Sequence, residues 1–281
     1  MAKEKVLILG LGEVGHTLFH LFKESGKFDV YGFDLDKVKM RSYVGQVEPP
    51  QNVDVMHVCY PCPDQEKFVQ TTLKYIGLFR PKLTIIESTV NPGTTRRIFI
   101  VSKLPMVHSP MRGMHTTPET MKRDVLFWRK YIGGTTEDST NAAKTHFEKL
   151  GLKVKVLKGP EETELAKLFD TTYRAWMIAC FQEMHRISRC FQADFDEVVD
   201  MLEDGHRVIL DRPIHYPDVI GGHCLIPNTE LLLKSYDSKF LRLILESNEK
   251  RKEEIRDKSV KEEVEKVRKR ATALQKEIVK R

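Results

Sequence analysis

A glycine-rich turn constrains this chain more than any other feature of its sequence. The residues Gly10-Leu-Gly-Glu-Val-Gly15 match the pattern G-x-G-x-x-G. The turn follows the apolar run Val6–Leu9, which predicts a buried strand, and it precedes apolar residues at helical spacing. Asp34 stands at the end of the next expected strand, Phe28–Phe33. Strand, turn, helix and a distant acidic residue in this order indicate a dinucleotide-binding unit.

Each residue of this motif has an expected role. Gly10 permits the tight turn, Gly12 lets the backbone approach a pyrophosphate, and Gly15 allows close helix packing. Asp34 is expected to accept hydrogen bonds from ribose hydroxyls and, with Asp36, to repel a 2′-phosphate. The motif therefore favours NAD over NADP. The plainer alternative is a glycine turn in an α/β fold that binds nothing.

The rest of the first half alternates short apolar runs with helix-like segments. This pattern predicts an α/β fold with a Rossmann-type, doubly wound and mostly parallel sheet that ends near Lys158. The further expected strands are Val53–Tyr60, Leu83–Glu87, Leu104–Val107, Tyr131-Ile132 and Val154–Leu157.

The second half has a helical pattern throughout. A long helix is expected from Gly159-Pro160, another from Asp194, and a third over Thr229–Leu245. The last 36 residues are highly charged and have few apolar positions, which predicts a solvated helix or a frayed end. We therefore expect a dinucleotide-binding domain over 1–158, an all-helical central domain over 159–245 and a charged helical tail over 246–281.

Composition excludes several classes of function. The net charge is +6, and residues 246–281 carry 13 Lys/Arg against 9 Asp/Glu, so the remainder is nearly neutral and does not resemble a nucleic-acid-binding body. No apolar run is long enough to cross a membrane, and the first residues do not resemble a secretory signal. Five cysteines without regular spacing do not indicate a disulfide framework. A reducing cytoplasm is the expected location.

Several segments together resemble the UDP-glucose/GDP-mannose dehydrogenase family over most of residues 3–235. Besides the glycine motif, the landmarks are Val58-Cys-Tyr-Pro-Cys-Pro63, Glu87-Ser-Thr-Val-Asn-Pro-Gly-Thr94, Glu164-Leu-Ala-Lys-Leu168 and Gly221-Gly-His-Cys-Leu-Ile-Pro227. The last is the most diagnostic, because it resembles the segment that carries the family's catalytic cysteine. The resemblance implies an oxidoreductase that converts the alcohol of a sugar nucleotide to a carboxylate with two NAD.

The resemblance also implies roles for individual residues. Cys224 corresponds to the nucleophile, Lys167 to the cation that stabilises an oxyanion, and Thr89 to a group that positions water or the reacting oxygen. The candidate catalytic residues are Cys224, Lys167, Thr89, Asn228 and Thr171. The candidate cofactor-binding residues are Gly10, Gly12, Glu13, Val14, Gly15, Asp34, Tyr60, Pro61 and Thr89.

Plainer interpretations stand beside these roles. A lone cysteine such as Cys224 is often a small core residue, and a helical lysine such as Lys167 is often a solvated charge. Cys59 and Cys62 form a C-x-x-C pair, which we interpret as part of a cofactor-side loop rather than a metal site. His223 either tunes the neighbouring thiol or is simply exposed to solvent.

The chain departs from the family pattern at several positions. Thr171 stands where the family usually has asparagine, and Asn228 where it usually has an aspartate that assists water. Met111, in His108-Ser-Pro-Met-Arg-Gly113, stands where a glutamate is expected. The family also continues into a second nucleotide-binding domain, whereas we expect no further α/β domain from the charged tail. The nucleotide of the substrate is then bound elsewhere, bound by a partner chain, or not bound.

Three functions remain open at this point. The first is an NAD-dependent oxidoreductase of this family, with a small-molecule substrate such as a sugar nucleotide. The second is a β-hydroxyacid-type dehydrogenase that makes a single oxidation without a cysteine, and the third is a non-catalytic NAD-binding or assembly protein. The family resemblance also implies a homodimer through the long central helix. Trp176, Met177 and Phe181 supply apolar surface either for that contact or for packing within the chain.

Overall fold

The computed structural model describes residues 2–41, 49–112, 117–211 and 213–279. The chain forms two compact units, Met1–Lys167 and Leu168–Arg281. The boundary falls inside a long helix rather than before it at Lys158. The division into three domains stays a prediction.

A seven-stranded sheet forms the centre of the first unit, in the order β2-β1-β3-β4-β5-β6-β7. All neighbouring strands are parallel except β5 and β6. The expected doubly wound, mostly parallel sheet is therefore confirmed. The strands are β1 (Glu4–Leu9), β2 (Phe28–Phe33), β3 (Val55–Val58), β4 (Leu83–Ile86), β5 (Met106–His108), β6 (Lys130–Gly134) and β7 (Val154–Val156).

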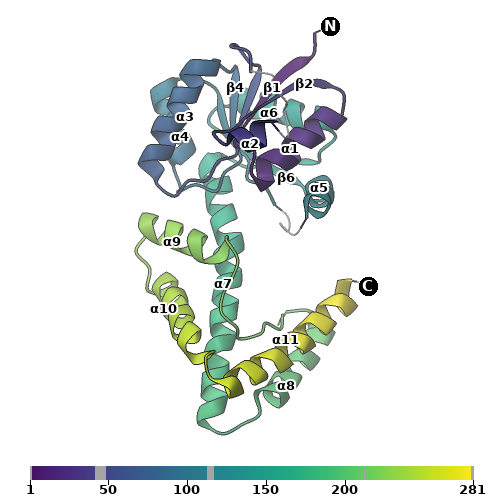
Figure 1. Cartoon of the computed structure of the whole chain (residues 1–281), viewed down its shortest axis with the longest axis vertical. Helices are drawn as coiled ribbons and strands as arrows, with labels where there is room; N and C mark the ends of the chain where they lie inside the picture. Colours follow the sequence, from purple (N-terminus) through teal and green to yellow (C-terminus); the bar gives the residue numbers. More distant parts are fainter. Residues whose placement is uncertain (1, 42–48, 113–116, 212, 280–281) are drawn as a thin grey trace. The chain divides into compact units, whose positions relative to one another are not determined.

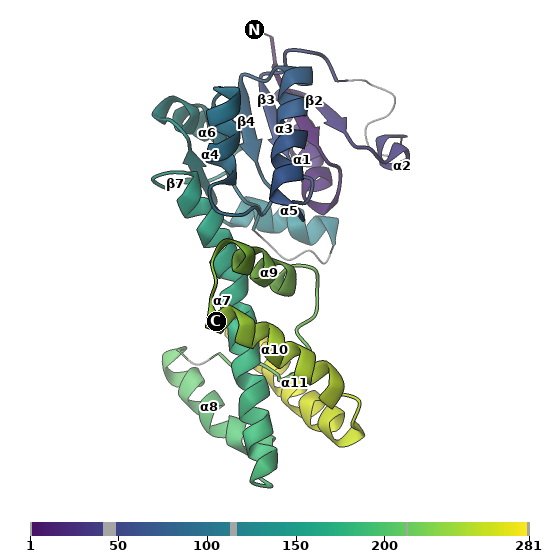
Figure 2. The same ribbon diagram turned by 90° about the vertical axis from the view of Figure 1, so that its left-hand side faces the viewer.

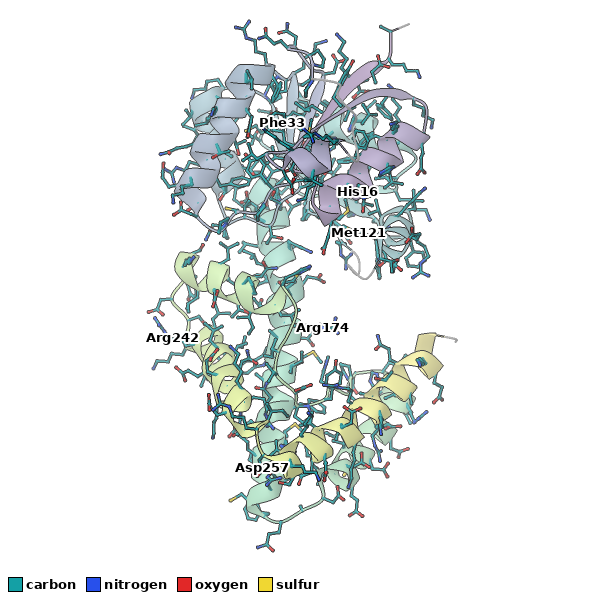
Figure 3. All side chains as sticks on the ribbon, viewed as in Figure 1. His16, Phe33, Met121, Arg174, Arg242 and Asp257 are labelled. Carbon is teal, nitrogen blue, oxygen red and sulfur yellow. The ribbon has the colours of Figure 1, made fainter. Side chains whose placement is uncertain are left out.

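Helices cover both faces of this sheet. Apolar residues of α1, α5 and α6 form one core cluster with the strands, and those of α3 and α4 form the other. Figure 1 shows these two helical layers on opposite sides of the strands, and Figure 2 turns the face with α3 and α4 toward the viewer. Figure 3 shows His16 on α1 and Met121 on α5, two helices that pack together. The helices are α1 (Glu13–Glu24), α2 (Lys37–Lys39), α3 (Gln65–Phe79), α4 (Thr94–Ser102), α5 (Pro118–Phe127) and α6 (Glu137–Leu150).

A buried polar network passes through the core between the sheet and α6. Glu87, which follows β4, pairs with Lys130 at the start of β6, and its carboxylate lies 3.0 Å from Nδ1 of His57. Nε2 of His57 lies 2.9 Å from Nε2 of His146, whose Nδ1 lies 2.6 Å from the Glu4 carboxylate. The side chains of Glu87 and His57 are both 0% exposed. These contacts join residues that are far apart in the sequence, so the local sequence patterns do not predict them.

Burial and the neighbouring groups determine the protonation states of this network. Burial lowers the pKa of His57 to about 4, so this imidazole is neutral near pH 7. Burial alone raises the pKa of Glu87, but Lys130 and His57 outweigh it and hold that pKa below its usual value. Lys130 and the hydrogen bond with His57 therefore keep Glu87 ionised in the core.

The long helix α7 (Pro160–Cys190) begins at the expected proline. Beyond Lys167 the chain is helical, with α8 (Phe195–Ile209), α9 (Leu225–Ser235), α10 (Lys239–Glu254) and α11 (Lys258–Val279). The expectation of a single helix over Thr229–Leu245 is wrong, because the helix is interrupted at Tyr236–Ser238. Ser238 is the N-cap of α10 and accepts a hydrogen bond from the backbone N–H of Leu241.

The charged tail forms part of the core of the second unit. It is helical, but the expectation of a solvated or frayed end is wrong. One face of α11 is buried, and Figure 1 shows α11 beside α8. Ala271 fills the gap between the more obvious apolar residues Val267 and Leu274, which makes the apolar stripe continuous. The buried residues of this stripe are Val260, Val264, Val267, Ala271 and Leu274.

Candidate active site

The glycine turn leaves no space for side chains at two of its positions. Gly10 has φ +85°, and a Cβ added there would lie 2.8 Å from the backbone nitrogen of Tyr60. A Cβ added at Gly15 would lie 1.8 Å from the carbonyl oxygen of Gly10. The turn after β1, the segment after β3 and the first turn of α1 are thus packed backbone against backbone.

Gly12 differs from both of these glycines. It has φ −71°, an ordinary value, and a Cβ added there would meet nothing within 4 Å. Gly12 is the N-cap of α1 and provides no side chain to cap the helix. The open space therefore lies over the positive end of a helix, as a diphosphate requires. Glu13 and Val14 supply the next backbone positions of this helix.

Asp34 connects the end of β2 to the glycine turn. One of its carboxylate oxygens accepts a hydrogen bond from the backbone N–H of Leu11 at 2.6 Å, and the other accepts one from Asp36 at 2.9 Å. Lys39 lies 3.9 Å from the same carboxylate. Each carboxylate oxygen retains a further lone pair, so Asp34 is fixed in place and can still accept hydroxyl hydrogen bonds.

The C-x-x-C segment after β3 does not bring its two thiols together. Cys59 packs against the core cluster that includes α1, whereas Cys62 belongs to the cluster on the other face of the sheet. Burial raises the pKa of the Cys59 thiol well above its usual value. Between them, the Tyr60 hydroxyl lies 2.6 Å from Oγ1 of Thr72, and Pro61 is exposed. Among the described residues, no group of three or more His, Cys, Asp or Glu side chains has the arrangement of a metal site.

Two catalytic candidates lie at the carboxyl edge of the sheet in the first unit. Thr89 follows β4 and is half-buried. Lys167 is also half-buried, and its ammonium donates a hydrogen bond to the carbonyl oxygen of Met111 at 2.9 Å, in the segment that follows β5. β4 and β5 are parallel neighbours, so both segments leave the sheet at the same edge. Ligands of doubly wound folds bind at this edge.

Glu164 ties the start of α7 to this edge, a role that sequence reasoning did not assign. Its carboxylate accepts hydrogen bonds from the backbone N–H groups of Gly93 at 2.6 Å and Thr95 at 2.9 Å. It thereby caps α4, whose N-cap residue Gly93 has no side chain to do so. Burial raises the pKa of Glu164 to about 7.

Cys224 lies in the second unit, at the N-cap of α9. Its sulfur is 3.0 Å from Nδ1 of His223, and its carbonyl oxygen accepts the backbone N–H of Asn228 at 2.9 Å. Cys224 is half-buried and His223 is exposed. A neighbouring imidazole and the N-terminus of a helix both favour the thiolate form of a cysteine.

The two departures from the family pattern in this region contact each other. The amide of Asn228 donates a hydrogen bond to Oγ1 of Thr171 at 3.2 Å, and the Thr171 hydroxyl donates to the carbonyl oxygen of Leu168. Both side chains are buried. Thr171 and Asn228 thus form a neutral pair between α7 and α9.

The candidate residues therefore divide between the two units. The glycine turn, Asp34, Tyr60, Thr89 and Lys167 lie in the first, and Thr171, Cys224 and Asn228 lie in the second. Their assembly into one pocket stays a prediction.

The helical region of this chain matches the model of a known protein family. Residues 161–250 match the central domain of the UDP-glucose/GDP-mannose dehydrogenase family. In this region the chain is similar to members of that family. Its relatives include the UDP-N-acetyl-D-mannosamine dehydrogenase of Methanocaldococcus jannaschii, 26% identical over 88% of this chain and 65% of the relative. The UDP-glucose 6-dehydrogenase of Campylobacter jejuni is 23% identical over 88% of this chain and 72% of its own length.

Solved structures of several dehydrogenases share the fold. The UDP-D-ManNAc dehydrogenase of Pyrococcus horikoshii superposes with a TM-score of 0.73 at 22% identity, over 87% of this chain and 68% of that one. A 3-hydroxyisobutyrate dehydrogenase of Mycobacterium tuberculosis superposes with a TM-score of 0.67 at 14% identity, over 95% of this chain and 100% of that one. The chain spans about 65% of the length of the first relative. No helix in the described ranges has the length and apolar character needed to span a membrane.

Proposed function

We propose that this chain is an NAD-dependent oxidoreductase that converts the primary alcohol of a sugar nucleotide to a carboxylate. The observation that carries the proposal is the His223–Cys224 pair at the start of α9, within the segment that matches the family's central domain. The relatives named as dehydrogenases of UDP-N-acetyl-D-mannosamine and UDP-glucose supply the substrate class.

The first unit fits the dinucleotide. The open N-terminus of α1 at Gly12 suits the pyrophosphate, and the fixed carboxylate of Asp34 suits the adenosine ribose and opposes a 2′-phosphate. Glu13, Val14, Tyr60, Pro61 and Thr89 complete the proposed contacts. When bound, NAD supplies the hydride acceptor for each of two oxidations.

The protein's own groups carry the remaining chemistry. Once the alcohol has become an aldehyde, His223 takes the proton of the Cys224 thiol, and the resulting thiolate adds to the carbonyl carbon. The Lys167 ammonium stabilises the negative oxygen that develops. The second oxidation leaves a thioester on Cys224, and a water positioned by Thr89 cleaves it to the acid and the free thiol.

His223 compensates for carboxylates that this chain lacks. Asn228 is an amide and Met111 a thioether, so neither accepts a proton where the family resemblance implies an acid. The imidazole of His223 is a titratable group in contact with the nucleophile. Thr171 and Asn228 act in this proposal by fixing α9 rather than as bases.

The substrate range is tested by incubating the chain with NAD and separate samples of UDP-N-acetylmannosamine, UDP-glucose and GDP-mannose. We expect one of them to yield about two NADH per molecule together with the sugar acid. Bound NAD, detected by thermal stabilisation, without turnover on any substrate would contradict the enzyme and favour the NAD-binding alternative.

A single-step hydroxyacid dehydrogenase is the second candidate. The 3-hydroxyisobutyrate dehydrogenase that superposes over its entire length favours it, since that protein has no additional nucleotide-binding domain beyond the matched fold. One NADH per substrate molecule from the unmodified chain, with a 3-hydroxyacid as substrate, would select this candidate over the first.

Two glycine variants separate cofactor binding from folding. Gly12→Ala is expected to leave the melting temperature unchanged, because the added methyl group meets no protein atom. It should weaken NAD binding at least about tenfold by crowding the pyrophosphate. Gly15→Ala should instead lower stability by about 1–3 kcal/mol or more, because its Cβ would collide with Gly10. Calorimetric titration and thermal melts of both variants test the pair, and unchanged NAD affinity in Gly12→Ala would contradict the assigned site.

We also propose a homodimer through the second unit. Phe181 is buried within the chain and packs near Phe195, so it is not free for a partner. An apolar groove lies instead beside Trp176, where Phe169 and Phe240 are 54% and 66% exposed. A dimer mass by light scattering at micromolar concentration is expected, and a monomer mass would overturn this assembly.

A further inference from the structure

The segment that carries Cys224 has no regular structure of its own. Residues 210–224 connect α8 to α9, and the described part of this stretch contains neither helix nor strand until α9 begins. Gly221 and Gly222 directly precede His223, and they provide no side chains that could hold the backbone. The position of the thiol therefore depends on anchors before the glycines and after the cysteine.

Two buried side chains hold the three residues before Gly221. The amide of Gln182 on α7 donates a hydrogen bond to the carbonyl oxygen of Asp218 at 2.7 Å. Oδ1 of Asn248 on α10 accepts the backbone N–H of Ile220 at 2.7 Å. Gln182 and Asn248 are 0% and 1% exposed, so both hydrogen bonds are protected from competing water.

The charged C-terminal helix provides a third anchor at the same place. Arg268 of α11 pairs with Oδ2 of Asp218, while Oδ1 of that carboxylate accepts the backbone N–H of Val219 at 2.7 Å. The guanidinium also lies over the ring of Tyr216, 5.2 Å from its centroid. One carboxylate thus joins α11 to the loop backbone, and one arginine contacts the loop at two points.

The backbone after the cysteine is anchored independently. The Cys224 carbonyl oxygen accepts the backbone N–H of Asn228, and the Asn228 side chain binds Thr171 on α7. Cys224 therefore lies between two anchored stretches, and the upstream one is held jointly by Gln182, Asn248 and Arg268. We expect loss of the Arg268 contact to loosen the part of this stretch that the Asp218 carboxylate holds.

We propose that Arg268, through its ion pair with Asp218, is a positioning residue for the Cys224 thiol. The proposal rests on the proposed function of Cys224 and assigns a role in it to the charged tail. Arg268 does not touch the reacting atoms. It restricts the loop so that the sulfur is presented in one orientation.

The test compares two arginines of α11 in the full chain. Arg268→Met removes the contacts with the loop. Arg270→Met is the matched control, because the ion pairs of Arg270 are with Asp196 and Asp200 on α8 rather than with the loop. Hydrogen exchange of the peptide spanning 216–224 is measured without substrate, together with the rate of Cys224 alkylation by iodoacetamide.

We expect Arg268→Met to accelerate exchange of the Val219 amide, which donates to the Asp218 carboxylate, at least about tenfold and to change the alkylation rate. Arg268→Lys should restore part of the protection, since it keeps the charge, and Arg270→Met should leave both readouts at the unmodified level. With substrate, Arg268→Met should lower kcat and leave the KM for NAD unchanged.

Unchanged exchange and alkylation in a folded Arg268→Met variant would overturn the proposal. Equal acceleration in Arg270→Met would also overturn it, because the effect would then reflect general loosening of α11. If Arg268→Met alone accelerates loop exchange while the unmodified chain shows no turnover, the anchor is supported and only the proposed function fails.

Discussion

Cys224→Ala is expected to lower formation of the sugar acid by more than about 10³-fold, because it removes the thiol that is proposed to form the thioester. NADH release should fall from about two to at most one per substrate molecule, since the first oxidation needs no thiol. NAD affinity should not change, because the residues proposed to bind NAD lie in the first unit. Stopped assays that quantify the acid, the aldehyde and NADH in parallel measure all three.

Cys190→Ala is the matched control for this substitution. Cys190 is an exposed cysteine at the end of α7, so its removal takes away a reactive thiol without touching the loop of Cys224. It should retain full acid formation. Undiminished acid formation in Cys224→Ala would contradict the covalent route.

Glu87→Ala is expected to reduce the free energy of unfolding by about 3–5 kcal/mol, because it strands the Lys130 ammonium in the core. Lys130 is only 4% exposed, and the same substitution removes the carboxylate partner of His57. Urea denaturation near pH 7 measures the loss. Glu66→Ala is the control, since Glu66 pairs with Arg97 at the surface, where ion pairs contribute little.

A double variant distinguishes a stranded charge from simple loss of packing. Glu87→Met combined with Lys130→Met removes both buried charges and should recover most of the stability lost in Glu87→Met alone. If the single variant loses less than about 1 kcal/mol, Lys130 has found another counter-charge and this description of the network is wrong.

Local patterns in the sequence predict the sheet and the glycine turn well. The apolar run Val6–Leu9 lies within β1, because a buried parallel strand needs a continuous apolar segment. The start of α7 at Pro160 is also read locally. These features are determined by residues that are close together in the sequence, so a single sequence is enough to predict them.

Contacts between distant residues could not be predicted in this way. His57 and His146 are in contact although they lie 89 residues apart in the sequence. In the sequence itself, each is only a histidine within or near apolar residues, which does not indicate its partner. Glu164 resembles an ordinary acidic residue near the start of its own helix, yet its carboxylate caps α4. The burial of the C-terminal helix is hard to predict, because Ala271 is small and only weakly indicates a buried face, although it completes the apolar stripe of α11.

The hydrogen bond between Thr171 and Asn228 restricts how this chain and its relatives can exchange residues at these positions. Changing Asn228 alone to aspartate would place a carboxylate in a site that is 8% exposed, beside a single hydroxyl. Changing Thr171 alone to asparagine would crowd two amides together. The effects of the two substitutions are therefore expected to be non-additive: each change alone should destabilise the buried contact, and both changes together should cost less than the sum of the two.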